Sequence, residues 1–126
     1  MVSPKKISGD LAEDAACTYL QSQGLMLIER NYLCKCGEID LVMRQADCTV
    51  FVEVRFRKHS HYGSAAETVD WRKQKKLLAT AARYLQQHSR AAKGPCRFDV
   101  MALSLKTPTR QNPEYHIDWI MDAFQA

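Results

Sequence analysis

The chain has 126 residues, a length that suits one domain and is sufficient to bury a hydrophobic core. Hydrophobic residues make up 46% and charged residues 25%, as in ordinary globular proteins, and no apolar run approaches the roughly 20 residues that span a membrane. The net charge of +4 permits a polyanionic partner but does not require one. No apolar stretch follows the first lysines as it would in a secretory signal, so we expect a soluble cytoplasmic protein.

The hydrophobic pattern predicts one α/β domain over residues 1–126, beginning with a loose basic tail at residues 1–8. A first helix opens at Asp10, which can serve as its N-cap, and stops at Gly24. A second long helix is predicted at 68–88, between two groups of strands rich in β-branched and aromatic residues. The strands are expected at 25–31, 38–44, 49–57, 96–105 and 115–121, with loops at 58–67 and 106–114. The predicted order is therefore α-β-β-β-α-β-β.

The chain has five cysteines, an odd number. Their spacing fits neither a disulfide framework nor a four-ligand zinc site. We therefore expect reduced thiols.

The second and third predicted strands each have one apolar face and one face that carries charge, because side chains alternate along a strand. In the third strand the charged face holds Glu53, Arg55 and Arg57. In the second strand Asp40 lies on the charged face, and the opposite face is expected to hold Ile39, Leu41 and Met43. The two strands are joined by the short connection 45–48, which predicts a hairpin.

Pairing Arg44 with Thr49 in this hairpin places Asp40 opposite Glu53, with Cβ atoms about 4.5–5.5 Å apart. Two carboxylates at that distance repel, so a raised pKa, a nearby cation such as Arg55 or a bound metal must offset the repulsion. Mg²⁺ suits this place because it takes one or two protein carboxylates and keeps waters and substrate phosphates. The alternatives are an exposed Glu–Arg surface pair, and a register shifted by two residues that separates the carboxylates.

Polar residues on the two helices are further candidates. Glu13 lies at the margin of the first helix's apolar face, where it either reaches the seam with the sheet or stays in solvent. Gln74 projects from the middle of the second helix's apolar face, toward either the acidic pair or partners in the core. A basic surface on the second helix either binds a nucleic-acid backbone or is merely solvated. It comprises Arg72, Lys75, Lys76 and Arg83, extended by Arg55, Arg57 and Lys58.

Three further residues have expected roles. Asp99 lies in a predicted strand and is expected to support the sheet or the site. Trp71 and Trp119 are expected in the core rather than in contact with bases.

Several motifs follow one another in a specific order. The most specific part is GEIDL, from Gly37 to Leu41, followed after a short connection by FVEVR, from Phe51 to Arg55. The others are Gly9-x-x-x-Glu13, LIERNY at 27–32, Gly63, Lys73-Gln74 and RFDVMAL at 97–103. This set resembles the YraN-like family of small bacterial proteins, which is related to archaeal Holliday-junction resolvases. The resemblance covers nearly the whole chain.

The resemblance implies a restriction-endonuclease-like fold, with a mixed central β-sheet flanked by helices. It implies a site for Mg²⁺ or Mn²⁺ held by Asp40, Glu53 and Glu13. Gln74 would point to this site and Lys73 to a phosphate. Arg55 stands where such nucleases usually carry the lysine of an E-x-K pair. Arginine stabilises negative charge on a phosphate but does not easily act as a base, so this departure weakens the expectation of cleavage.

Together these patterns indicate a metal-dependent endonuclease, a phosphodiesterase that acts on DNA, with branched or structured DNA as candidate substrates. We expect no membrane partner, and a homodimer would suit the two cuts that a four-way junction needs. The expected nucleic-acid-binding residues are Arg57, Arg72, Lys73, Lys75 and Lys76. The alternatives are a non-catalytic nucleic-acid-binding module on a nuclease scaffold and a protein-interaction domain.

Overall fold

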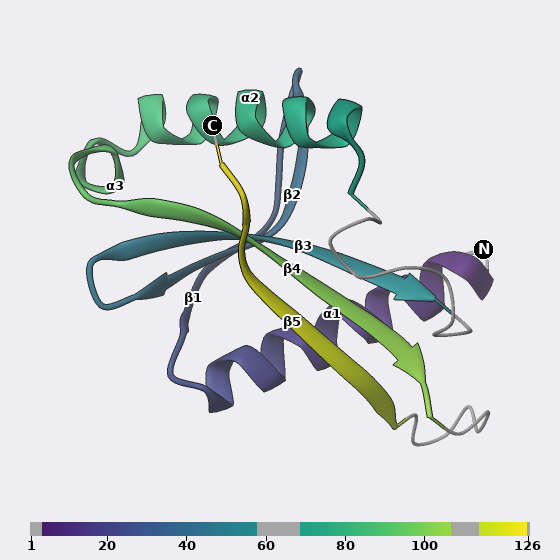
Figure 1. The fold of residues 1–126 in the computed structure, drawn as a ribbon. Helices are drawn as coiled ribbons and strands as arrows, with labels where there is room; N and C mark the ends of the chain where they lie inside the picture. Colours follow the sequence, from purple (N-terminus) through teal and green to yellow (C-terminus); the bar gives the residue numbers. More distant parts are fainter. Residues whose placement is uncertain (1–3, 58–68, 107–113, 126) are drawn as a thin grey trace.

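The computed structural model describes residues 4–57, 69–106 and 114–125, with side chains from residue 9 onward (Figure 1). Its elements are α1 (Pro4–Ser22), β1 (Met26–Cys34), β2 (Gly37–Gln45), β3 (Cys48–Arg57), α2 (Trp71–Gln87), α3 (Ser89–Lys93), β4 (Cys96–Leu105) and β5 (Tyr115–Phe124). The predicted order of strands and long helices is confirmed. The short helix α3 lies where the sequence indicated only a connection. Lys58, Gly63 and most of the two predicted loops lie outside the described residues.

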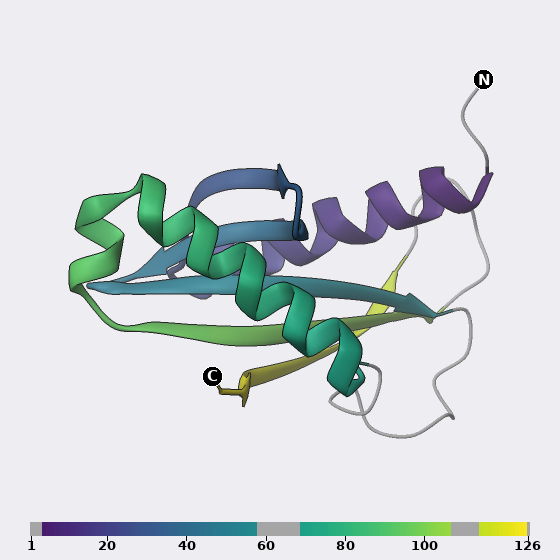
Figure 2. The same cartoon turned by 90° about the horizontal axis from the view of Figure 1, so that it is seen from above.

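The five strands form one mixed sheet in the order β1-β2-β3-β4-β5. β3 and β4 run parallel, and every other neighbouring pair is antiparallel. Two parallel neighbours need a crossover connection, and α2 lies in the connection between β3 and β4. Helices α1 and α2 cover opposite faces of the sheet, as Figures 1 and 2 show. The expected mixed central sheet flanked by helices is thereby confirmed.

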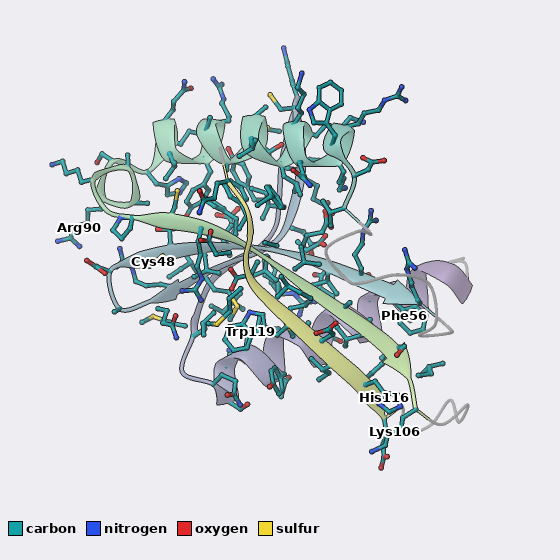
Figure 3. The ribbon with its side chains drawn as sticks, in the orientation of Figure 1. Cys48, Phe56, Arg90, Lys106, His116 and Trp119 are labelled. Atoms are coloured by element: carbon teal, nitrogen blue, oxygen red, sulfur yellow. The ribbon has the colours of Figure 1, made fainter. Side chains whose placement is uncertain are left out.

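Helix α1 begins at Pro4, earlier than the N-cap expected at Asp10, so residues 4–8 belong to the helix rather than to a tail. Proline is tolerated in the first turn of a helix, where its missing N–H has no intrahelical partner to lose. Small side chains let α1 approach the sheet closely, because Ala12 and Ala16 are fully buried against it. This face of the sheet also holds Trp119, which lies between β5 and α1 in Figure 3 and packs edge-on against Tyr19.

Helix α2 covers the other face through a ring cluster on the sheet. Tyr84 of α2 packs edge-on against Phe51 of β3, and Phe51 stacks on Phe98 of β4. The helix begins after Asp70, whose side chain accepts a hydrogen bond from the backbone N–H of Lys73 as an N-cap. Trp71 does not join this core, contrary to expectation: it is 65% exposed because it stands in the first turn, beyond the buried stretch of α2.

The β1–β2 hairpin bends away from β3 and runs beside α2 (Figure 1). The β2–β3 pairing ends at Leu41 with Val52, while β1 and β2 stay paired as far as Cys34 and Gly37. The bend separates side chains that were expected to share a face. Ile39 packs with the cluster under α2, whereas Leu41 packs with the cluster over α1.

Gly37 allows the close contact between this hairpin and α2. Its φ is +150°, and a Cβ atom there would lie 3.2 Å from Thr80 Oγ1 and 3.9 Å from Lys76 Cβ. We expect Gly37→Ala to lower the free energy of unfolding by about 1–3 kcal/mol, because strain and crowding act together. Urea denaturation would measure the loss. The matched control is Gly24→Ala, which also has positive φ (+96°) but open space around it and should cost less. Equal losses in the two variants would contradict the crowding.

None of the helices in the described ranges is long and apolar enough to span a membrane. All five cysteines are free thiols.

Candidate functional site

The predicted register of the hairpin is confirmed, with Arg44 paired to Thr49 and Leu41 to Val52. One residue beyond the last of these pairs, Asp40 stands opposite Glu53. Asp40 does not continue the ladder, because its Oδ2 accepts the backbone N–H of Val54 at 2.8 Å. The two carboxyl groups therefore meet at the point where β2 leaves β3.

The environment of the pair strongly favours a protonated carboxyl group on Asp40. Burial raises the pKa of Asp40 to about 8, together with a hydrogen bond to Glu53 and repulsion by its charge. The Val54 N–H and the Lys73 ammonium oppose this rise. Asp40 is half-buried as a residue, but its carboxyl end is shielded. Glu53 is only 6% exposed, so the alternative of a solvent-exposed surface pair is wrong.

Lys73 brings a positive charge to this pair from α2. Its Nζ lies 3.4 Å from Glu53 Oε2 and forms an ion pair. The contact lacks hydrogen-bond geometry, and this buried oxygen has no hydrogen-bond partner. The sequence indicated Lys73 only as a phosphate contact. Its inward position could have been predicted from the sequence, because Lys73 lies four residues before the buried Leu77 and therefore on the same side of α2.

Arg55 of β3 and Gln74 of α2 are the other two residues that were expected at the pair. Arg55 is half-buried and follows Glu53 by two residues on the same face of β3. The side-chain amide of Gln74 donates to the backbone carbonyl of Val69 at 2.9 Å. This bond ties the segment before α2 to the first turn of the helix, and it corresponds to the hydrogen-bonded alternative for Gln74.

Glu13 is held by β1 and is 8% exposed. Its Oε1 accepts from Arg30 Nη2 at 2.9 Å and Nε at 3.2 Å, and its Oε2 accepts from Asn31 Nδ2 at 3.3 Å. In the β1–β2 ladder Arg30 pairs with Leu41, and Tyr32 pairs with Ile39. Asn31 therefore stands opposite Asp40. Glu13 thus reaches the strand position that faces Asp40.

Arg30 and Asn31, which hold Glu13, did not emerge as site residues from the sequence. Both lie in the LIERNY motif, and that was the available signal. Within the described ranges no group of three or more His, Cys, Asp or Glu side chains is arranged to hold a metal ion. The structure therefore brings together Asp40 and Glu53, and leaves Glu13 bound to its own partners.

The outer side of α2 is basic, and the 17 residues of the helix contain no acidic residue. Four cations are exposed on it, and we call them the basic surface of α2: Arg72, Lys75, Lys76 and Arg83. Figure 3 shows nitrogen-tipped side chains projecting from this side of the helix. Arg57, expected to extend this surface, is half-buried at the end of β3.

The family model described as uncharacterised protein family UPF0102 matches residues 12–103, a range that includes all the acidic residues of the site. The chain belongs to this family. The match confirms the resemblance to YraN-like proteins that the motifs indicated. The description of UPF0102 assigns the family no activity.

Curated UPF0102 proteins from several bacteria match nearly the full length. The protein of Stutzerimonas stutzeri (strain A1501) is 46% identical over 99% of this chain and 100% of its own. That of Pseudomonas syringae pv. tomato is 48% identical over 98% of this chain and 97% of its own. That of Ectopseudomonas mendocina is 50% identical over 94% of both chains.

Proposed function

We propose that this UPF0102 protein is a metal-dependent endonuclease acting on DNA, with branched or structured DNA as its substrate. The observation that carries the proposal is the buried contact between Asp40 and Glu53. Burial raises the pKa of Asp40 to about 8, together with the hydrogen bond to Glu53 and repulsion by its charge. Carboxylates held together against their repulsion, with perturbed pKa values, are typical of functional sites. The fold supports the same class of enzyme, because it has a mixed sheet with Asp40 and Glu53 at the point where β2 leaves β3, as expected of a restriction-endonuclease-like protein.

The acidic pair fits a divalent cation. Glu53 Oε2 is buried and lacks a hydrogen-bond partner, and a cation would satisfy this oxygen as well as relieve the repulsion from Asp40. Mg²⁺ or Mn²⁺ needs one or two protein carboxylates when substrate and water complete its shell. Asp40 and Glu53 would hold it. Bound there, the ion would polarise a phosphate and lower the pKa of a bound water.

The chain's own cations and hydrogen bonds would do the remaining work. Lys73, already 3.4 Å from Glu53, would release this carboxylate to the metal and turn to a substrate phosphate. It would thereby supply the ammonium group that the E-x-K pattern lacks at Arg55. Arg55 would stabilise negative charge on the phosphate. Glu13 would orient the site through Asn31, opposite Asp40.

The test is cleavage of four-way-junction and single-stranded DNA in Mg²⁺ or Mn²⁺. We expect Asp40→Asn to reduce the rate by about 100-fold or more, because one charged metal ligand is lost. The matched control is Asp118→Asn, which alters an exposed aspartate on β5 and should leave the rate unchanged. Undiminished cleavage by the Asp40→Asn protein would overturn the assignment.

A non-catalytic nucleic-acid-binding module is the second candidate, and the Lys73–Glu53 contact favours it. An internal ammonium group can neutralise the acidic pair without any metal. DNA binding that persists in EDTA, with no cleavage in any divalent metal, would establish this candidate.

A further inference from the structure

Trp71 is a large aromatic side chain that the fold leaves in solvent. It is the first residue of α2 and is 65% exposed. Lys75, one turn further along the helix, places its Nζ 4.0 Å from the centroid of the indole ring. This cation–π contact holds the ring in place from one side. A single exposed apolar residue is common on protein surfaces, so only the neighbouring residues can indicate whether Trp71 marks a binding surface.

Those surroundings are positively charged. Arg72 is the next residue, Lys75 lies over the ring, and Lys76 is also exposed. No acidic residue occurs within α2, and the exposed Asp70 directly before it is engaged as the N-cap, accepting the Lys73 N–H. A polyanion running along this helix would therefore meet both its counter-charges and a flat aromatic surface. Single-stranded nucleic acids bind through this combination, because each nucleobase has a π face that stacks on an aromatic side chain.

The position of Trp71 also connects it to the acidic pair. Lys73, which contacts Glu53, lies in the same first turn of α2. Lys73 points toward the sheet, while Trp71 stays at the exposed edge of the helix. A strand lying against this turn would thus have a base beside Trp71 and a phosphate within reach of the site.

We propose that Trp71 stacks against an unpaired nucleobase of a DNA strand whose phosphates follow the basic surface of α2. The proposal rests on the proposed function and deepens it, because it names single-stranded segments as what the site recognises. Lys75 keeps the indole ring oriented and contributes its charge to the neighbouring phosphates. Paired bases are stacked on each other inside a duplex, so a fully paired duplex gains nothing from Trp71.

The test compares affinities for a fluorescent single-stranded oligonucleotide and the same sequence as a duplex, by anisotropy in EDTA. We expect Trp71→Ala to weaken single-strand binding by about 5- to 150-fold and duplex binding by much less. Trp71→Phe, which keeps an aromatic ring, should retain much of the affinity. The matched control is Met121→Ala, which removes another exposed apolar side chain (51% exposed), on β5, and should change neither affinity.

Intrinsic fluorescence gives a second readout of stacking. The protein has two tryptophans, and Trp119 donates a hydrogen bond to Asp99 inside the fold. Quenching by an unlabelled single strand should therefore come from Trp71 and disappear in Trp71→Phe. Unchanged single-strand affinity of Trp71→Ala, or an equal loss for single strand and duplex, would overturn the proposal.

Parallel cleavage assays separate this proposal from the proposed function. If the wild type cleaves DNA in Mg²⁺ but Trp71→Ala binds single strands normally, the stacking role is wrong and the nuclease stands. If Trp71→Ala loses single-strand affinity in EDTA but no metal supports cleavage, the stacking role stands and the nuclease falls.

Discussion

Asp40→Asn is expected to make the protein more stable than the wild type at pH 8. The pKa of Asp40 is about 8 in the folded protein, against about 3.9 for an unperturbed aspartate. Between these values the folded state binds more protons than the unfolded state, so the wild type loses stability as the pH rises from about 4 to 8. The slope approaches about 1.4 kcal/mol per pH unit for one proton. Below about pH 4 Asp40 is protonated in both states, and the wild type keeps all of the stability that it loses at higher pH.

Asparagine removes this dependence because it stays neutral. Its oxygen can still accept the Val54 N–H, and its amide can donate to Glu53, as the protonated aspartate does. Because this slope acts over about four pH units, we expect a gain of roughly 4–6 kcal/mol at pH 8 and little change near pH 4. Urea denaturation at pH 4.5, 6 and 8 would measure it, with Asp118→Asn on the exposed side of β5 as control. A wild-type pH slope no steeper than that of Asp40→Asn would show that the pair is not strained.

The second large effect is expected at Asp99, which is fully buried in β4. Its Oδ1 accepts from Arg97 Nε at 3.0 Å and from the backbone N–H of Asp122 at 2.9 Å, while its Oδ2 accepts from Trp119 Nε1 at 3.0 Å. These bonds fix β5 against β4. Asp99→Ala would leave Arg97 Nε and two N–H donors without this acceptor and would remove the negative charge beside the guanidinium. We expect a loss of about 3–5 kcal/mol in the free energy of unfolding, measured in urea.

Two variants make this expectation specific to the network. Asp118→Ala removes an exposed aspartate from the neighbouring strand β5 and should cost little. Asp99→Asn keeps an acceptor oxygen but loses the charge that Arg97 needs, so its loss should be intermediate. A loss below about 1 kcal/mol in Asp99→Ala would mean that water replaces the carboxylate.

Much of the fold was predictable because its signals are local. The strand at 49–57 is rich in β-branched residues, and the helix at 68–88 has an apolar period of 3.6 residues. Both predictions agree with the structure within a few residues. Errors occurred where a long-range contact overrides the local pattern. Ile39 crosses to the face under α2 because the hairpin bends there. Trp71 remains exposed because the buried residues of α2 begin only beyond its first turn, at Leu77.

The sequence by itself determined that Asp40 and Glu53 lie on the charged faces of two strands joined by a short connection. The sequence left open a register shifted by two residues, and the structure has the one that pairs Arg44 with Thr49 and sets Asp40 opposite Glu53. Only the tertiary structure decided what this opposition means. Burial makes the charge on Asp40 costly, the departure of β2 from β3 frees its carboxyl group, and α2 brings Lys73 from twenty residues away to Glu53. These effects depend on the packing of a helix against a sheet, which no local pattern of residues encodes.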